Sequence, residues 1–299
     1  MSMTATAARI NVNSLSQSDK QALTRDTYAK KSYFQELFAQ DHIELDCEQF
    51  SRSFQNEIER ILLEKNLIKE KIPLSRVHEV LSDEMKTYNF DDGVNKISTY
   101  FYETDHAFME IYHQYIQFLR KNFVKEPFWF QGTTTIRIHC PNARNSHHYP
   151  RYHTDIAYGH PPEEINIWLP LTDILTGHGF RTMSVHSSKK VMESFDYDYE
   201  KLVHEAIHNK DFSSYCDTLS KPVATPFGKM LAFDPRCIHT GEPLVSHTRA
   251  SIDIRILPLS QYNKMTIEYQ GSGRRKILFN PGNCYNEQNS DYFLENTGR

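Results

Sequence analysis

The sequence RASIDIRI, residues 249–256, alternates polar and apolar side chains with a period of two. This period predicts a β-strand, because successive side chains of a strand point to opposite faces of a sheet. Arg249, Ser251, Asp253 and Arg255 would share one face, and the apolar residues between them the other. A charged face on such an apolar strand predicts a barrel whose interior holds a ligand rather than a solid core.

Three further segments have strand character, and polar residues again gather on one of their faces. Residues 133–139 place Arg137 and His139 on the same face. Residues 164–171 place Asn166 and Trp168 opposite a row of isoleucines and leucines, and residues 227–233 form the third segment. We expect Arg137, His139 and Asn166 to point into the barrel, although a solvated strand face is the alternative for all three.

Helical spacing of apolar residues runs from about residue 17 to residue 124, and a second helical stretch interrupts the strands at residues 188–222. An insertion of this length beside a site usually forms a lid or a substrate wall. We therefore predict one α+β domain over residues 1–299. It has a helical layer (1–125), a barrel core (126–260) containing the 188–222 lid, and a C-terminal extension (261–299).

Two histidines and one aspartate stand near these strands as His153-Thr154-Asp155 and the distant His239. This is the ligand set that holds Fe(II) on one face and leaves the other coordination positions open. An H-x-D spacing on an extended segment places both side chains on the same side. We predict that His153, Asp155 and His239 bind one metal ion.

Arg249 lies on the predicted strand that follows His239, and Ser251 lies two residues further along the same face. A guanidinium is planar and always charged, so it can grip a carboxylate with two parallel hydrogen bonds. Arg255 points to the same face and is the rival for this role. We favour Arg249 for the carboxylate of a co-substrate and leave Arg255 open.

These residues together resemble the Fe(II)/2-oxoglutarate-dependent dioxygenases, and most of all their phytanoyl-CoA dioxygenase-like branch with its streptomycin-biosynthesis-type hydroxylases. The resemblance covers residues 128–259. It rests on His153-Thr154-Asp155, the segment 158–173, Phe233-Asp234, His239-Thr240-Gly241 and the segment 248–255. It implies a double-stranded β-helix (a cupin-like jelly roll) flanked by helices. It also implies Fe(II), 2-oxoglutarate and O2 as cofactors, with Arg249 and Ser251 at the 2-oxoglutarate carboxylate.

We accordingly expect hydroxylation of an unactivated C–H bond in a small polar metabolite such as an amino acid, a sugar or a natural-product intermediate, with release of succinate and CO2. In related halogenating enzymes a small residue replaces the carboxylate ligand, so Asp155 favours hydroxylation or desaturation, and the sequence leaves these two and ring closure open. Co-substrate contacts are expected also from Arg137 and Asn166. The expected substrate contacts are Tyr158, His160, Arg181, His139 and Arg255.

Two other functions compete with this interpretation. His204-Glu205-Ala206-Ile207-His208 matches H-E-x-x-H, the helical zinc motif of metallopeptidases. Its histidines would face solvent, however, and His208 lacks the extension that supplies a third histidine, so an amphipathic lid helix explains it better. A catalytically inactive jelly-roll binding protein is the other alternative.

The composition of the chain argues against several other classes of protein. A formal net charge of −4 and 24% charged residues give no basic field that would attract nucleic acid. The chain shows no apolar run long enough for a membrane span and no signal-peptide pattern, so we expect a cytoplasmic protein. The 5 cysteines are scattered, which argues against a disulfide framework. Sequence alone leaves the oligomeric state open.

Overall fold

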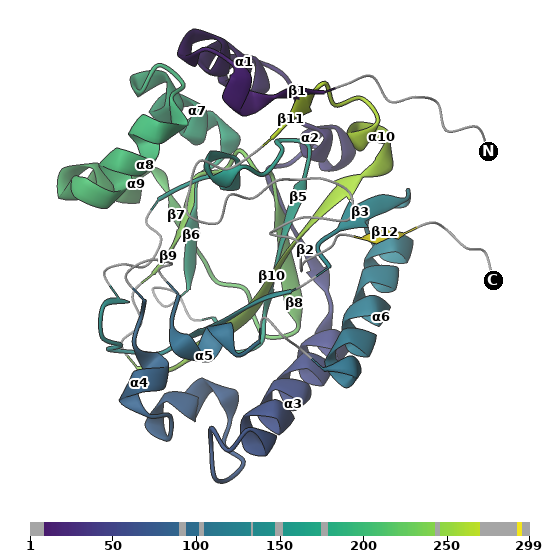
Figure 1. The fold of residues 1–299 in the computed structure, drawn as a ribbon, viewed down its shortest axis with the longest axis vertical. Helices are drawn as coiled ribbons and strands as arrows, with labels where there is room; N and C mark the ends of the chain where they lie inside the picture. The colour runs from purple at the N-terminus through teal and green to yellow at the C-terminus, as the bar shows by residue number, and fades with distance from the viewer. Residues whose placement is uncertain are drawn as a thin grey trace.

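A computed structural model describes residues 9–89, 94–101, 105–132, 134–146, 152–174, 179–242, 246–269 and 292–294. Most of the predicted C-terminal extension lies outside these residues, as does position 133 of the predicted strand 133–139. The described part combines helices with antiparallel sheets, which confirms the α+β class (Figure 1). Within it, every helix is too short or too polar to cross a membrane.

Seven of the described strands form one antiparallel sheet, in the order β12-β3-β10-β5-β8-β2 with β4 also paired to β10. We call it the main sheet. Its long central strand is β10, which pairs with β3, β4 and β5. The strand bounds are β2 (His42–Asp46), β3 (Phe128–Phe130), β4 (Thr135–His139), β5 (Ile165–Pro170), β8 (Lys229–Phe233), β10 (Arg249–Pro258) and β12 (Tyr292–Leu294).

A three-stranded antiparallel sheet, the small sheet, lies across from the main sheet (Figure 1). Its order is β7-β6-β9, with β6 (Phe180–Thr182) between β7 (Lys221–Val223) and β9 (His239–Gly241). Trp168 of the main sheet stacks on Phe180 of the small sheet, with ring centroids 5.3 Å apart. Phe233 meets the ring of His239 at 5.2 Å. The two sheets therefore face each other through aromatic side chains.

Helices cover the outside of the main sheet and the far side of the small sheet. Phe54 of α3 and Phe108 of α6 are fully buried and join one core with the isoleucines of β5 and β10. A second core lies between the sheets and α7–α9. The helix bounds are α1 (Gln17–Ala29), α2 (Tyr33–Phe38), α3 (Glu48–Glu64), α4 (Asp83–Lys86), α5 (Lys96–Thr99), α6 (His106–Asn122), α7 (Val185–Ser194), α8 (Tyr199–His208), α9 (Lys210–Leu219) and α10 (Leu259–Tyr262).

The register of the main sheet brings polar residues together on its inner face. Arg255 of β10 lies opposite Asn166 of β5, and Arg249 lies opposite His139 of β4. Ser251 lies opposite Arg137. Residues directly opposite in an antiparallel sheet share a face. The predicted polar face is therefore continuous across three strands, and the isoleucines form the opposite, helix-covered face.

The prediction of an all-helical layer over residues 1–125 was wrong at β2, which pairs with β8. Only Ile43 and Leu45 alternate in this five-residue segment, and a short edge strand is specified by its partner more than by its own pattern. The predicted insertion is helical, but its first helix begins at Val185, and its last residues form β7. A two-stranded parallel pair, β1 (Ile10–Asn11) with β11 (Ile267–Glu268), was also not predicted.

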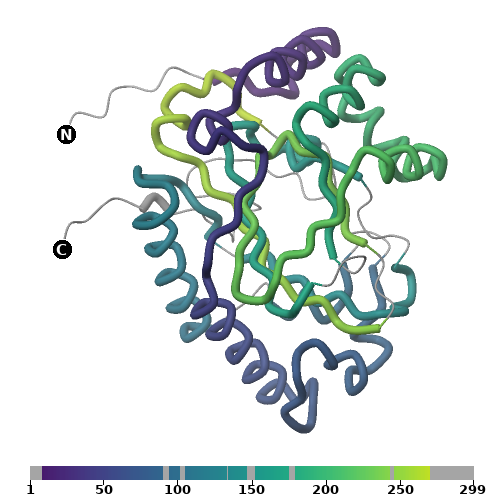
Figure 2. The backbone as a smooth tube through the Cα atoms, turned by 180° about the vertical axis from the view of Figure 1, so that it is seen from behind, coloured from purple at the N-terminus to yellow at the C-terminus, as the bar shows by residue number. Residues whose placement is uncertain are grey.

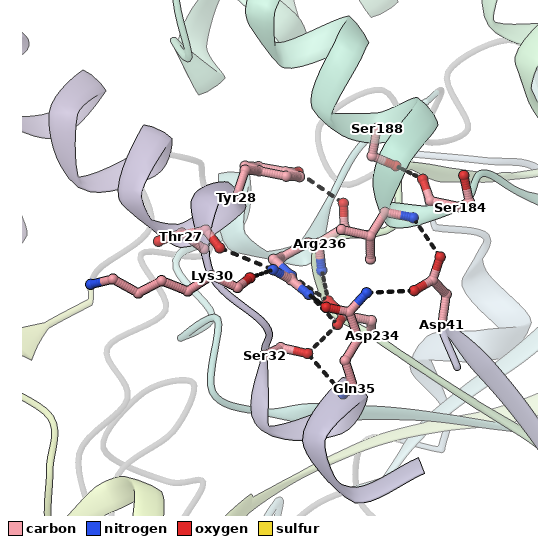
Figure 3. A network of polar contacts seen from close by, with 11 residues as sticks. Thr27, Tyr28, Lys30, Ser32, Gln35, Asp41, Ser184, Ser188, Asp234 and Arg236 are labelled. Carbon is pink, nitrogen blue, oxygen red and sulfur yellow. Dashed lines mark hydrogen bonds and ion pairs between the residues drawn. The ribbon is translucent and has the colours of Figure 1, made fainter. Parts of the chain in front are cut away.

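A buried ion pair ties the first two helices to the segment before β9 (Figure 3). The guanidinium of Arg236 donates to both carboxylate oxygens of Asp234, at 2.9 and 2.8 Å. It also donates to the carbonyls of Thr27 and Lys30, at 3.0 and 2.7 Å, and to Gln35 at 2.6 Å. Arg236 is 1% exposed and Asp234 0%. The charge of Arg236 thus neutralises Asp234, and its N–H groups satisfy two carbonyls at the C-terminal end of α1 and the side chain of Gln35 in α2. Both helices are thereby joined to the turn that leads to His239.

We expect Arg236→Met to lower the free energy of unfolding by about 3–5 kcal/mol, because it leaves the Asp234 carboxylate buried without its charge partner. Chemical denaturation measures the change. The control is Arg52→Met, which breaks an exposed pair with Glu48 on α3 and should change stability by less than about 1 kcal/mol. Equal denaturation midpoints for Arg236→Met and the wild type would show that this pair does not support the fold.

Candidate metal centre

His153, Asp155 and His239 meet between the two sheets. One ligand atom from each lies within 4.8 Å of the others, and among the described residues no other group of three or more His, Cys, Asp or Glu side chains gathers in this way. The Nε2 atoms of His153 and His239 lie 3.7 and 3.9 Å from Oδ1 of Asp155. The predicted convergence of these three residues is therefore present in the fold.

Backbone pairing brings the two histidines together. His153 and His239 form an isolated antiparallel bridge, with N–H to carbonyl hydrogen bonds of 3.0 and 2.9 Å in the two directions. Nδ1 of His239 lies 3.0 Å from the carbonyl of Cys237, an arrangement that leaves Nε2 to face the site. The rings of Phe180 and Phe233 pack against His239, at centroid distances of 5.3 and 5.2 Å, and restrict its rotation.

A change of backbone conformation right after Thr154 directs Asp155. Thr154 is extended, and its hydroxyl accepts from the N–H of Ala157, which caps the short 3-10 helix η4 (Asp155–Tyr158). The expected extended H-x-D segment thus holds at His153 and Thr154, while Asp155 already begins a helical turn. Asp155 is 4% exposed.

The two oxygens of the Asp155 carboxylate have different neighbours. Oδ1 faces the histidines, whereas Oδ2 accepts a hydrogen bond from Nε of Arg255 at 2.9 Å and forms an ion pair with its Nη2 at 2.8 Å. Burial by itself would raise the pKa of Asp155, but the charge of Arg255, followed by the nearby histidines, holds that pKa well below its ordinary value. The carboxylate is therefore ionised and ready to act as a metal ligand at neutral pH.

Arg255 was one of two arginines considered for a co-substrate carboxylate, and its guanidinium contacts a carboxylate of the chain itself. Its Nη1 also donates to Oε1 of Gln131, at 3.4 Å. Asp253, which lies between the two arginines in sequence, pairs instead with Arg137 at 3.5 Å and accepts from Ser251 at 3.3 Å. The inner face of β10 thus carries two separate charge pairs.

Arg249 lies at the other end of this face, 3% exposed, beside His139. Burial, followed by the positive charges of Arg249 and Arg137, lowers the pKa of His139 well below its ordinary value. Its Nδ1 is hydrogen-bonded to the hydroxyl of Tyr88. His139 is therefore neutral at physiological pH, and the local field around it is positive.

Asn166 lies opposite Arg255 on the inner face and is 2% exposed. Neither Oδ1 nor Nδ2 of its side chain has a hydrogen-bond partner among the described residues. A buried amide without partners costs on the order of 1–3 kcal/mol per unsatisfied group, so such groups usually mark a place for a ligand or water. Together with two imidazoles and one ionised carboxylate, this amide fits a site built for a metal ion and a polar ligand.

The remaining predicted substrate residues occupy three different places. The ring of Tyr158 packs against that of His153, with centroids 5.1 Å apart, and borders a cavity of about 400 Å³ between α1, α8 and η4. His160 is buried with Nδ1 2.9 Å from Oε2 of Glu164. Arg181 donates to the hydroxyl and carbonyl of Ser220, both at 3.0 Å, and to Glu242 at 3.2 Å.

The H-E-x-x-H segment lies on α8, where His204 and His208 line the cavity that Tyr158 also borders and do not join the group of His153, Asp155 and His239. His204 and His208 share one helix face, with ring centroids 4.7 Å apart. The side chain of His204 is 67% exposed. No third ligand joins the pair among the described residues. A solvated amphipathic helix accounts for this motif.

Two contacts of the site were not predicted. Tyr88 reaches His139 from a segment 51 residues earlier in the chain, where no local pattern indicates a buried contact. Phe233 packs on His239, although its alternation with Leu231 within β8 could have placed it on the inner face. The contact of Tyr88 with His139 depends on tertiary packing alone. The contact of Phe233 could have been predicted, because alternate residues of a strand share a face whether they are polar or apolar.

No protein-family model and no curated protein matches the chain. Among solved structures it is similar to AviO1 from Streptomyces viridochromogenes Tue57, with 14% identity and a TM-score of 0.46 over 76% of this chain and 94% of that one. HygX from Streptomyces hygroscopicus, solved with nickel and 2-oxoglutarate bound, shares 12% identity and a TM-score of 0.44 over 76% and 85%. The carbocyclase SnoK from nogalamycin biosynthesis shares 12% identity and a TM-score of 0.40 over 84% and 87%.

The geometry predicts that His239→Ala weakens binding of Co(II) by more than about 100-fold, since loss of a direct ligand should exceed the loss caused by an outer hydrogen-bond partner. Isothermal titration calorimetry under anaerobic conditions measures the affinity. The matched control is His208→Ala on α8, which should leave Co(II) affinity unchanged. The assignment of the site fails if the two variants behave in the opposite way.

We also predict a pH dependence that arises from His139. The folded state excludes a proton that the unfolded state binds below a pKa of about 6.5, so stability is present above that pH and is lost as pH falls below it, by up to about 1.4 kcal/mol per pH unit. His139→Gln keeps a polar side chain beside Tyr88 and removes this dependence. Denaturation in the presence of a chelator, at a series of pH values below neutrality, should give a shallower slope for the variant. Parallel slopes would contradict a neutral, buried His139.

Proposed function

We propose that this protein is a non-haem Fe(II)- and 2-oxoglutarate-dependent oxygenase that hydroxylates a small polar metabolite. The observation that carries the proposal is the meeting of His153, Asp155 and His239 beside a strand face that bears the buried Arg249 and the partly buried Arg255. The two facing antiparallel sheets are consistent with a double-stranded β-helix, which we propose as the fold. We likewise propose that the chain forms one domain.

The residues of the inner face have separate roles in this proposal. His153, Asp155 and His239 hold Fe(II), and Arg249 with Ser251 holds the distal carboxylate of 2-oxoglutarate. When bound, Fe(II) and 2-oxoglutarate together with O2 would supply the oxidising chemistry, with succinate and CO2 as co-products. The partnerless amide of Asn166 offers this ligand a donor and an acceptor within the site.

The charged side chains of the inner face favour a co-substrate with two negative charges. The inner face carries three arginines, Arg137, Arg249 and Arg255, against two carboxylates, Asp155 and Asp253. A divalent cation would raise this positive excess further, and a buried positive excess is stabilised by an anion. A chelating dicarboxylate neutralises the metal and the excess arginine together. Asp155 also keeps the carboxylate position of the metal occupied, which favours hydroxylation.

Three of the residues predicted to contact the substrate already have partners within the chain, and these partners limit the roles that the residues can have. Arg255, Arg181 and His160 already contact carboxylates of the chain. We propose that they shape the site, and that Tyr158 and His139 are nearer to the substrate. Tyr158 stands between His153 and the cavity beside α8, so a substrate in that cavity would reach the site past its ring.

The direct test is the formation of succinate from 2-oxoglutarate by the Fe(II)-loaded protein, measured with a panel of polar metabolites. Arg249→Lys keeps the charge but loses the two-pronged grip, so the KM for 2-oxoglutarate should rise by about tenfold or more. Asp155→Ala should abolish succinate formation.

Glu205→Gln serves as the control, because a zinc peptidase would depend on this residue and an oxygenase would not. Succinate formation should be the same in this variant as in the wild type. Peptide hydrolysis that requires Glu205 and is indifferent to Asp155 would replace the proposal with the peptidase alternative. Metal binding without oxygen consumption for every metabolite tested would favour a binding protein.

A further inference from the structure

The two oxygens of Asp155 are held in a way that a simple metal ligand does not require. Oδ2 accepts a hydrogen bond from Nε of Arg255 and forms an ion pair with Nη2 of the same guanidinium. Oδ1 is left toward Nε2 of His153 and His239, at 3.7 and 3.9 Å. The side chain of Asp155 is 6% exposed and that of Arg255 is 15% exposed, so this contact lies mostly away from water.

We propose that Arg255 is a positioning residue, which clamps Oδ2 so that Asp155 binds the metal through Oδ1 alone. The proposal rests on the function given above and deepens it. A carboxylate that binds through both oxygens occupies two coordination positions, and the metal of this site needs its open positions for a chelating co-substrate and oxygen. By holding Oδ2, Arg255 keeps one of those positions open.

The clamp is anchored on a rigid part of the fold. Arg255 lies in the middle of β10, where the strand pairs with β5 on one side and β3 on the other. Its carbonyl accepts from the N–H of Gln131, at 3.3 Å, and its Nη1 donates to the side chain of the same residue. Gln131 is 0% exposed. The guanidinium is thus fixed from both its backbone and its far end.

The planar fork of arginine suits this task better than an ammonium. Nε and Nη2 lie on one edge of the group and reach a single oxygen together, while Nη1 is left for Gln131. A lysine would supply a similar charge from a flexible stem, without a fixed plane. Arg255→Lys therefore keeps the positive charge beside Asp155 but removes the planar group, so it tests whether the geometry of the clamp matters in addition to its charge.

Removal of the clamp should affect metal and co-substrate differently. Arg255→Met deletes a positive charge beside the metal position, which favours the cation, while it frees the carboxylate to rotate and to bind through both oxygens. Affinity for the metal should therefore stay within about threefold of the wild type or increase. Affinity of the metal-loaded protein for 2-oxoglutarate should fall by about tenfold or more, because the second oxygen of Asp155 would compete for a coordination position that the chelating co-substrate needs.

The experiment uses the nickel-loaded full-length chain, in which binding of 2-oxoglutarate is measured by calorimetry without turnover. The variants are Arg255→Met and Arg255→Lys, and the control is Arg60→Met on α3, whose guanidinium contacts Glu57, Glu64 and Asp105. The control should match the wild type in both affinities. Arg255→Lys should bind 2-oxoglutarate less well than the wild type but no worse than Arg255→Met.

The visible absorption of the Co(II)-loaded proteins provides a second readout, because the intensity of its d–d bands falls as the coordination number rises. Arg255→Met should give bands that differ in position or intensity from those of the wild type, because the second oxygen of Asp155 either adds a ligand or replaces a water. Equal affinities and equal spectra in Arg255→Met and the wild type would overturn the proposal. A parallel loss of metal and 2-oxoglutarate affinity together with a lower Tm would overturn it as well, because that result describes a merely structural residue.

These experiments distinguish a failure of the proposed function from a failure of the proposal about Arg255. If nickel-loaded wild type does not bind 2-oxoglutarate, the proposed function fails, and the clamp is then judged by the Co(II) spectra alone. Changed bands in Arg255→Met would still support one-oxygen ligation by Asp155 in the wild type, and unchanged bands would end that proposal too.

Discussion

The backbone bridge between His153 and His239 is the constraint on which the site depends. Two hydrogen bonds join segments that are far apart in the chain, and the imidazoles of both residues then lie on the same side, beside Asp155. The buried pair of Arg236 with Asp234 holds the segment before His239 against the first two helices. The first two helices therefore support the metal centre through the turn that leads into β9. In Figure 2 the purple N-terminal part of the chain lies beside green segments from its later part.

Charge compensation organises the rest of the inner face. Asp155 is ionised because Arg255 lies beside it, and His139 is neutral because it is buried near Arg249 and Arg137. Both pKa values are lowered, but the outcome differs: Asp155, at the start of η4, carries its charge, whereas His139, at the end of β4, is neutral. An enclosed face with a surplus of guanidinium groups attracts an anion, and the amide of Asn166 adds hydrogen-bonding capacity that the described protein does not use.

Sequence patterns predicted the parts of this arrangement that follow from local periodicity. The alternation in β10 placed Arg249, Ser251 and Arg255 on one face, and the H-x-D motif with a distant histidine indicated a metal site. The partner of Arg255 could not be predicted, because Asp155 lies 100 residues away in the chain and only the tertiary fold brings it near. Edge strand β2 and Tyr88 were missed for the same reason: their roles depend on distant partners and leave little trace in their own segments.

The most direct measurement is a crystal structure grown without oxygen, with Fe(II) and 2-oxoglutarate, and with anomalous diffraction recorded at the iron edge. The account predicts one anomalous peak bound by Nε2 of His153, Nε2 of His239 and a single oxygen of Asp155, with the distal carboxylate of 2-oxoglutarate on Arg249. A peak at His204 and His208 on α8, or side chains of residues 153, 155 and 239 that point away from a common ion, would contradict it.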